Sequence, residues 1–444
     1  MNGFARVQKI EWLNNLLNKN ISDHQRVGFS ASALLLCFFA NIVDPFTAEN
    51  NKIFFSLTVE LLGFFASLSL MVLSINKLHK TGLTRERHVP AKLFFAGISV
   101  WTVYCLVGIY SNFVVAPPTV TRSLDDAYIG YLSLISISMF ILSTLGSRDI
   151  QKGFLASIFC FASLILVISL YTSRHVLWNE SMSFYGIFTR ADHAQGYQIS
   201  RASGLARMLA VLLFFTFAIL LVRFMKKLTY QFSFINILLS MMSLVIISLM
   251  ILLQSRGAII ASFLSIVSVI FVIIVQKYKK NNFVILGLAL FIIITGFFMM
   301  NFLFIPRFEN SSFFSGWSGR GEIWQLIIRT QDNQWLGCGF QCDRILTGQS
   351  ASNGFVYAYA TSGLVGLISV LIICSLLSLV WIAFSARLIR SNYIELFSFF
   401  AIPFLLLRII SESGFLVFGF DLILLAVVSG ILTSPFLSKK EHRL

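Results

Sequence analysis

The stretch QSRGAIIASFLSIVSVIFVIIVQ, Gln254–Gln276, joins a single charged turn to a long apolar run. Its segment 258–276 contains no charged residue and approaches the roughly 20 residues that a helix needs to cross a bilayer. A lipid-exposed segment must satisfy its own backbone hydrogen bonds, so only helices and closed barrels span membranes. Because the apolar residues are continuous and do not alternate with polar ones, the stretch predicts a transmembrane helix.

Similar apolar runs recur along the whole chain. Mean hydropathy is +0.83 and only 12% of the residues are charged, whereas soluble domains carry about 25%. This composition excludes a soluble globule, and we predict an all-α polytopic membrane protein formed by one integral membrane domain, residues 1–444. The twelve predicted spans are 29–46, 53–75, 93–115, 128–145, 154–172, 204–222, 232–253, 258–276, 283–305, 354–384, 393–410 and 415–434.

Basic residues are distributed unevenly over the connections between these spans. Most of the 34 Lys and Arg residues lie in the two terminal segments and in alternate connections, namely 76–92, 146–153, 223–231, 277–282 and 385–392. Lys and Arg are retained on the cytoplasmic side, so we predict that both termini are cytoplasmic. The net charge of +15 is then a topology signal, and no nucleic-acid partner is expected.

The opposite side is predicted to carry two long polar loops, a main loop at 306–353 and a second loop at 173–203. Among the basic residues assigned to this side, Lys52 is the one lysine and the others are arginines. A guanidinium group grips phosphate or carboxylate through paired hydrogen bonds, which an ammonium group does not do. The bias favours an anionic ligand on this side, and the alternative is chance combined with ordinary ion pairs.

Within the main loop, GRGEIWQLIIRTQ, Gly319–Gln331, predicts a short amphipathic helix lying at the membrane surface. Arg320 falls at the start of this helix and Arg329 at its end. Because a helix N-terminus attracts anions, Arg320 is well placed to hold one. The alternative is that Arg320 pairs with Glu322 or Glu309 and only orders the loop.

Three further arginines are candidates for the same anion. Arg256 lies directly between two apolar runs, where a charge is costly and usually faces a cavity or a partner. Snorkelling to the headgroups is the alternative. Arg201 and Arg207 flank the start of the span at 204–222 and are predicted to face the same cavity, with Arg207 the weaker candidate.

The loops also contain a candidate base and a cysteine pair. His193, beside Asp192 and Arg190, has the chemistry of a general base, although a lone loop histidine is more often simply solvated. Cys338 and Cys342 are four residues apart, a spacing that fits either a disulfide or two free thiols. No His/Cys cluster has metal-ligand spacing, so neither a metal nor another cofactor is expected.

Two stretches carry a resemblance to a known family. SGRGEIWQLIIRTQDNQWLGCGF, Ser318–Phe340, resembles the Gly-Arg-x-x-x-Trp and Leu-Gly-x-Gly-Phe patterns of bacterial O-antigen ligases and polymerases. SNGFVYAYATSGLVGL, Ser352–Leu367, resembles the His-Asn-x-x-Leu segment of this family that leads to Gly-Leu-x-Gly-Leu, with matches at Asn353, Gly363, Leu364, Gly366 and Leu367. The SRGA turn at 255–258 also resembles this family, and RASG at 201–204 does so more loosely. The resemblance spans about residues 200–370.

The resemblance implies a metal-independent glycosyltransferase of the bacterial inner membrane whose site faces the periplasm. Such an enzyme passes an oligosaccharide from undecaprenyl diphosphate to a sugar hydroxyl, among membrane lipids and with a chain-length regulator or a flippase as candidate protein partners. The resemblance implies Arg256 and Arg320 as catalytic groups, and the polar loop adds His193 as the predicted base. The predicted substrate-binding residues are Arg201, Trp324 and Asn353, which lie in the matched motifs, and Arg207, which lies near Arg201.

One residue departs from the family pattern. Ligases carry a histidine directly before the asparagine, and this chain has Ser352 there. Because a serine cannot replace an imidazole as a base at neutral pH, the base would be His193, Asp192 or Glu322. The departure favours a polymerase over a ligase that delivers glycan to lipid A-core.

A transporter or flippase is the alternative from another class, since such proteins also have about twelve spans. Few ionisable residues lie within the predicted spans, among them Glu60, Glu395, Arg408 and Asp421. We expect Glu60 and Asp421 to be buried partners of Arg408 or Arg256. The polar residues are concentrated in one external region, which favours chemistry at the surface over alternating access.

Overall fold

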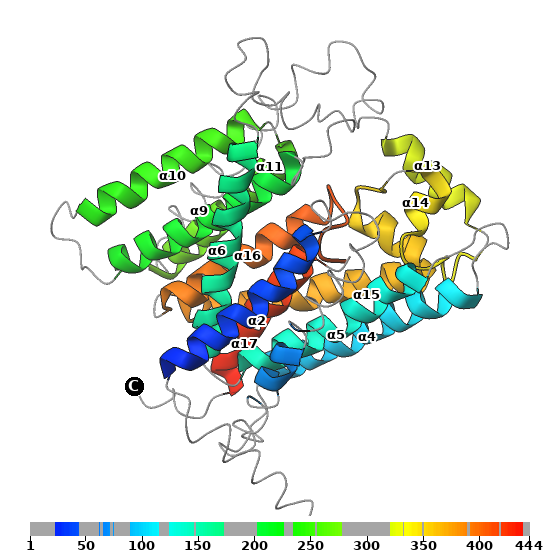
Figure 1. Ribbon diagram of the computed structural model, residues 1–444, viewed down its shortest axis with the longest axis horizontal. Coiled ribbons are helices and arrows are strands. Elements are labelled where there is room, and N and C mark those ends of the chain that lie inside the picture. The colour runs from blue at the N-terminus through cyan, green and yellow to red at the C-terminus, as the bar shows by residue number, and fades with distance from the viewer. Residues whose placement is uncertain are drawn as a thin grey trace, which may run out of the picture.

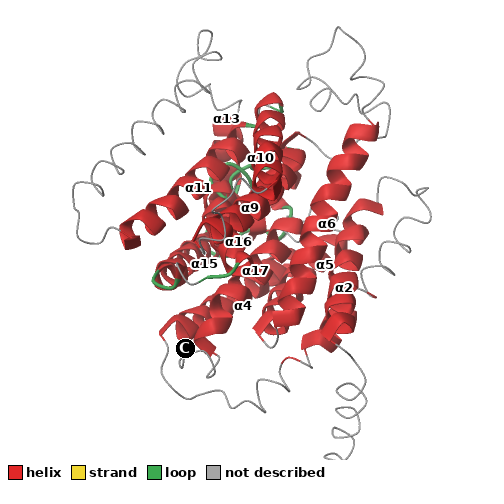
Figure 2. Ribbon diagram, turned by 90° about the vertical axis from the view of Figure 1, so that its left-hand side faces the viewer, coloured by secondary structure: helices red, strands yellow, loops and turns green. Residues whose placement is uncertain are grey.

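The protein is helical, and no strand occurs in the part of the chain that the structure describes (Figures 1 and 2). Six of the described helices are long and apolar enough to cross a membrane. The chain is therefore an all-helical, multi-pass membrane protein. The structure is a computed structural model that describes residues 23–43, 62, 65–71, 74, 89–114, 124–145, 148–172, 202–225, 234–253, 255–277, 320–331, 333–348, 350–388, 391–416 and 419–437.

Helices coincide with most of the predicted spans. They are α2 (Asp23–Val43), α4 (Val89–Val114), α5 (Leu124–Leu145), α6 (Arg148–Thr172), α9 (Ala202–Met225), α10 (Phe234–Leu252), α11 (Arg256–Lys277), α15 (Gly354–Ser385), α16 (Tyr393–Arg408) and α17 (Phe420–Leu437). Shorter helices are α13 (Arg320–Thr330), α14 (Cys342–Thr347) and the 3-10 turn η4 (Gly414–Leu416). The predicted span 283–305 lies outside the described residues and 53–75 is described only in part, so both stay predictions.

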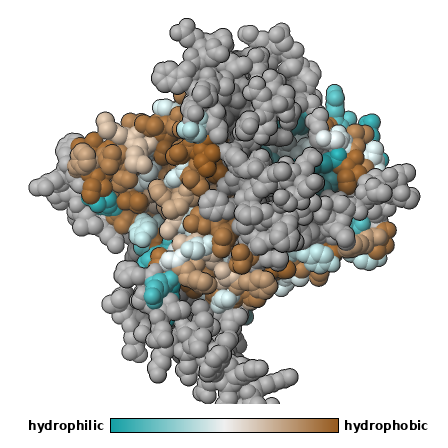
Figure 3. Space-filling model, in the orientation of Figure 1, coloured by the Kyte–Doolittle hydropathy of each residue, from teal (hydrophilic) through white to brown (hydrophobic). Residues whose placement is uncertain are grey.

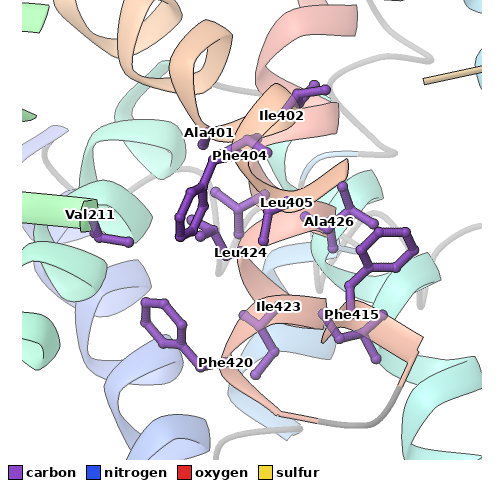
Figure 4. Close-up of a cluster of buried hydrophobic side chains, with 14 of the residues drawn as sticks. Val211, Ala401, Ile402, Phe404, Leu405, Phe415, Phe420, Ile423, Leu424 and Ala426 are labelled. Carbon is purple, nitrogen blue, oxygen red and sulfur yellow. The ribbon is translucent and has the colours of Figure 1, made fainter. Parts of the chain in front are cut away.

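Helices α16 and α17 form the centre of the bundle. Helix α17 packs against α5 and α16, and α16 packs in turn against α11 and α9. Figure 4 shows the apolar contact in which Val211 of α9, Phe404 of α16 and Phe420 of α17 face one another. All three side chains are less than 9% exposed. This tightly packed region surrounds the charged groups described below.

Helix α10 lies at the periphery and packs mainly along α9. Its large apolar side chains point outward, including Phe234 at 77% and Leu244 at 65% exposure, and hydrophobic surface gathers over this region in Figure 3. An apolar outer face of this kind is what a helix in contact with lipid presents, because lipid tails are as apolar as its side chains.

Small residues bring neighbouring helices into close contact elsewhere. A Cβ atom on Gly153 of α6 would overlap the Ser30 side chain of α2, and one on Gly430 of α17 would overlap Thr144 of α5. The Ser157 hydroxyl of α6 also donates to the Ala31 carbonyl of α2 at 2.5 Å. Small side chains and interhelical hydrogen bonds are the usual means of association in membranes.

Helix α15 is broken at Ser362 and Gly363, whose backbone angles are not helical. The freed carbonyls do not stay unpaired, since Ala360 accepts from Cys338 N at 2.9 Å and Thr361 from Gly339 N at 2.8 Å. The amide of Leu364 donates to the Gln334 carbonyl at 2.8 Å. The segment 334–339, part of the motif NQWLGCGF, therefore fills the break and satisfies its backbone groups, which burial requires.

This insertion is possible because each of the two crossing segments has a glycine at the point of contact. Gly337, at φ +70°, would place a Cβ atom 2.6 Å from Gly363 N, and Gly363 itself has φ +61°. The next aromatic residue, Phe340, is fully buried beside the Tyr104 ring, with ring centroids 6.1 Å apart. A Cβ atom on Gly108 of α4 or on Gly130 of α5 would lie within 2.7 Å of the Phe340 ring.

We predict that Gly337→Ala destabilises the protein by about 1–3 kcal/mol more than Gly348→Ala, because its methyl group must overpack the α15 break. Gly348 is the matched control, since it has the same φ of +70° and nothing within 4 Å of an added Cβ atom. Thermal unfolding of the detergent-solubilised variants measures the difference. Equal melting temperatures for the two variants would show that the left-handed backbone alone sets the cost.

Candidate functional site

The candidate site is built around the turn that follows α16, residues 409–412. The last carbonyls of a helix have no partner within the helix and need donors from elsewhere. Here Ile409 O accepts from Gly354 N at 2.6 Å, Ile410 O accepts from Asn353 Nδ2 at 3.1 Å, and Ser411 O accepts from Arg320 Nη1 at 3.2 Å. Three successive carbonyls of this turn thus bind segments that are distant in sequence.

Arg320 is the first residue of α13, as predicted, and its guanidinium group is half-buried. Within the described residues its side chain makes one hydrogen bond, to the Ser411 carbonyl. No ion pair with Glu322 occurs, and Glu309 lies outside the described residues. A guanidinium group has five N–H donors, so Arg320 can be held by the turn and still present donors to a ligand.

Helix α13 is itself held at both ends against the start of α15. The Trp324 indole Nε1 donates to the Ala351 carbonyl at 2.7 Å, and Gln331 Nε2 donates to the Tyr359 carbonyl at 3.0 Å. Ile327 supplies the buried apolar contact of the helix. These contacts fix where Arg320 lies, so α13 is a positioned element and not a free amphipathic helix.

The start of α11 lies beside the same turn. Arg256 is its first residue, and a Cβ atom added to Gly257 would lie 2.7 Å from the Ser411 hydroxyl oxygen. The backbone of the predicted Ser-Arg-Gly turn therefore meets the residue whose carbonyl holds Arg320. The side chain of Arg256 lies outside the described part of the chain, so its direction stays a prediction.

Beneath the turn lies a network of buried charges. Arg408 is 1% exposed and Asp421 is 3% exposed, and their closest side-chain atoms, Nη1 and Oδ2, are 3.0 Å apart. This confirms the predicted pairing of Asp421 with Arg408. Arg408 Nη2 also binds Glu412 Oε2, and Arg207 Nη1 lies 3.2 Å from Asp421 Oδ2. Two guanidinium groups thus face two carboxylates, which offsets the cost of burying each charge.

Aromatic rings complete the surroundings of this network. The Arg408 guanidinium carbon lies 5.5 Å from the Phe404 ring centroid, and that of Arg207 lies 5.4 Å from the Phe420 ring centroid. Cation–π contacts of this length are favourable in dry surroundings. Arg207 was predicted to face a ligand cavity, and in the structure its Nη1 group is engaged by Asp421.

Asn353 also serves the fold directly. It caps α15, and its Oδ1 accepts from Phe355 N at 2.9 Å and from Val356 N at 3.2 Å. Its amide nitrogen donates to Ile410 O, as described above, so one side chain joins the start of α15 to the end of α16. The neighbouring Ser352 has φ +48°, and its hydroxyl donates to Ser350 O at 3.4 Å.

The cysteines of the loop form a disulfide, Cys338–Cys342, with Cα atoms 5.7 Å apart. Sequence spacing had left this pairing open. The disulfide closes the segment that carries Phe340 and leads directly into Asp343, which is 1% exposed. The Asp343 Oδ2 atom accepts from Ala351 N at 2.7 Å. Burial raises the pKa of Asp343 above its usual value, and this hydrogen bond opposes the shift in part.

Some predicted site residues lie outside the described residues, namely Arg201, His193 and Asp192. Sequence reasoning had overlooked Glu412, the exposed end of the charge network. Its spacing from Arg408, four residues on, is a local signal that pairs the two on one helical face. Glu60 and Asp421 were considered from the sequence as partners of Arg408, and Glu412 was not.

No protein-family model and no curated protein matches the chain. The site is therefore interpreted from its own residues.

We predict that Asp421→Ala destabilises the protein by about 3–5 kcal/mol, because it removes the buried carboxylate of Arg408 and leaves only the partly exposed Glu412 as its partner. Lys152→Ala is the control, since it removes an ion pair whose Lys152 side chain is 49% exposed, and such pairs contribute about 0–1 kcal/mol. Denaturation in detergent, followed by tryptophan fluorescence, measures both changes. A loss for Asp421→Ala no larger than that for Lys152→Ala would contradict the prediction.

Asp343 generates a pH prediction. Its folded-state pKa is raised, so the folded state holds the proton more tightly than the unfolded chain. The resulting stabilisation is present below the unfolded pKa of about 3.9 and is lost as pH rises through the folded pKa. We expect the melting temperature to fall more steeply over this range for the wild type than for Asp343→Asn, which keeps a neutral acceptor for Ala351 N. Melting temperatures that fall equally with pH for the wild type and for Asp343→Asn would contradict this prediction.

Proposed function

We propose that this protein is a metal-independent glycosyltransferase of the bacterial inner membrane, acting on oligosaccharides linked to undecaprenyl diphosphate at the periplasmic face. Polymerisation of O-antigen or another surface polysaccharide is the preferred reaction. Attachment of glycan to lipid A-core is the alternative within the same chemistry, and the substitution of Ser352 for the histidine of the ligases disfavours it.

One observation carries the proposal. The turn after α16 holds Arg320 through Ser411 O and touches Gly257, the residue that follows Arg256. The starts of α11 and α13, each carrying an arginine, thus meet at one turn. Two helix N-termini that each begin with an arginine are the kind of anion site that a diphosphate requires.

The proposed topology has twelve spans with both termini cytoplasmic. This topology assigns the starts of α9, α11, α15 and α17 and the end of α16 to one side of the membrane. The ion pairs and hydrogen bonds around the turn join these same helix ends. In this proposal the side that they share faces the periplasm, where lipid-linked repeat units are available.

The chemistry follows from the leaving group. An acceptor hydroxyl attacks the anomeric carbon, the bond between that carbon and the diphosphate oxygen breaks, and negative charge develops on the diphosphate. Fixed cationic donors stabilise that charge more in the transition state than in the ground state. Arg320 and Arg256 take this role in the proposal, Arg201 supports them, and Trp324 lines the approach as part of α13.

The break in α15 is the one feature that favours a transporter, since transporters use interrupted helices near buried charges. In such proteins the freed backbone groups line a substrate path. Here they bind Cys338 and Gly339, so the interruption is filled by the protein itself. The carboxylate of Asp421 is likewise occupied, since Arg408 and Arg207 bind its oxygens. A glycosyltransferase therefore accounts for more of the geometry than a transporter does.

We predict that Arg320→Ala lowers the rate of polymer formation by about 100- to 1,000-fold, the usual effect of removing one donor from a developing anion. Arg320→Lys should retain part of this activity, because an ammonium supplies charge without the planar fork. Arg329→Ala, at the exposed far end of α13, is the matched control and should leave the rate unchanged.

The readout is a lipopolysaccharide gel of a deletion strain complemented with each variant. Loss of a polymerase leaves core carrying one repeat unit, whereas loss of a ligase leaves no repeat attached and glycan stranded on the carrier. A gel that is unchanged by the deletion and by Arg320→Ala would overturn the proposed function, and accumulation of repeat units on the cytoplasmic face would favour a flippase.

A further inference from the structure

Glu412 is the accessible carboxylate of the charge network. Its side chain is 32% exposed, against 3% for Asp421. Both oxygens of Asp421 are occupied, Oδ1 by Arg408 at 3.4 Å and Oδ2 by Arg408 and Arg207. Glu412 uses Oε2 to bind Arg408, and within the described residues its Oε1 accepts no hydrogen bond. Of these two carboxylates, only Glu412 can reach a ligand.

Glu412 also lies where a base would be needed. It directly follows Ser411, whose carbonyl binds Arg320 and whose side chain touches Gly257. Arg320 and the start of α11, which are proposed to hold the diphosphate, therefore both lie against Ser411. Glu412 is the next residue, and consecutive Cα atoms are only about 3.8 Å apart. An acceptor sugar that approaches the anomeric carbon beside this diphosphate comes within reach of the carboxylate.

The network gives this carboxylate a fixed direction. Glu412 is held by Arg408, Arg408 by Asp421, and Asp421 by Arg207. Arg408, Asp421 and Arg207 lie in helices α16, α17 and α9, and α16 packs against both of the others. A base that is oriented by a second group, itself held by a third, is the recurrent arrangement in enzymes that activate a hydroxyl.

We propose that Glu412 is the general base of the transfer reaction, an inference that rests on the proposed function. Glu412 accepts the proton of the acceptor hydroxyl as the oxygen of that hydroxyl bonds to the anomeric carbon. The bond between the anomeric carbon and the diphosphate oxygen breaks, and its electron pair leaves with undecaprenyl diphosphate. Glu412 then releases the proton to water. Arg408, Asp421 and Arg207 are positioning residues.

This assignment explains how the protein can have a general base although Ser352 takes the place of the histidine of the ligases. The Ser352 hydroxyl donates locally to the Ser350 carbonyl and makes no hydrogen bond to the turn 409–412. Glu322, another carboxylate considered from the sequence, is exposed on α13 and makes no hydrogen bond to the turn among the described residues. Among the carboxylates that the structure describes, Glu412 combines partial exposure, a fixed orientation and adjacency to the Arg320 anchor.

The test uses the purified full-length protein and lipid-linked repeat units extracted from a strain that lacks the gene. We expect Glu412→Gln to lower kcat by about 100- to 10,000-fold with KM unchanged, the range for loss of a general base. Glu412→Asp should recover part of the rate. Glu412→His should be active, with a rate that falls below about pH 6.5, where an imidazole becomes protonated.

The pH dependence of the rate distinguishes a general base from a residue that only binds Arg408. If Glu412 only bound Arg408, Glu412→His would not change the pH dependence of the rate. Glu395→Gln is the matched control, since Glu395 lies at the start of α16, the helix that leads into the turn of Glu412, in a capping box that glutamine also satisfies. Its rate should equal that of the wild type.

Two results would overturn the assignment while the proposed function stands: an active wild type with Glu412→Gln within tenfold of its rate, or a Glu412→His variant with the wild-type pH profile. A wild-type protein that forms no polymer from the extracted repeat units would instead refute the proposed function, and the assignment with it.

Discussion

The carbonyl groups at the end of α16 impose the constraint on which this structure depends. A helix that ends inside a protein leaves carbonyls that must find donors, because an unpaired backbone group in dry surroundings is costly. Helix α16 ends in a turn whose carbonyls at 409, 410 and 411 accept from Gly354, Asn353 and Arg320. This solution brings the start of α15 and the start of α13 to one place, and α11 begins beside them.

The charged groups beneath the turn follow from the same requirement. Arg408 is the last residue of α16 and is almost fully buried, which demands carboxylate partners on neighbouring elements. Asp421 provides one from α17 and Glu412 provides another from the turn itself, while Arg207 of α9 also binds Asp421. Stability of the bundle end and orientation of Glu412 are thus two results of one network.

The loop that carries the LGCGF segment has a different physical basis. It enters the break in α15 because Gly337 and Gly363 remove the side chains that would collide, and because its amides replace the helical donors that the break removes. The Cys338–Cys342 disulfide and the burial of Phe340 then hold the loop against α4 and α5. Helix α13, with Arg320, is attached to this arrangement through Trp324 and Gln331.

The sequence alone determined that the protein is helical and crosses the membrane several times, because transfer of apolar residues into lipid and the need for internal backbone hydrogen bonds act on each segment by itself. It also located α13 and placed Arg320 at its start, since glycines before an amphipathic stretch are a local signal. The pairing of Asp421 with Arg408 could be predicted from the sequence as one alternative, because a buried charge needs a partner of opposite charge. Only the tertiary structure decided that Ser411 holds Arg320, that Asn353 and Arg207 bind groups within the protein, and that Glu412 is the carboxylate left accessible. These outcomes depend on contacts between residues far apart in the chain, and no periodicity or composition encodes which helix ends will meet.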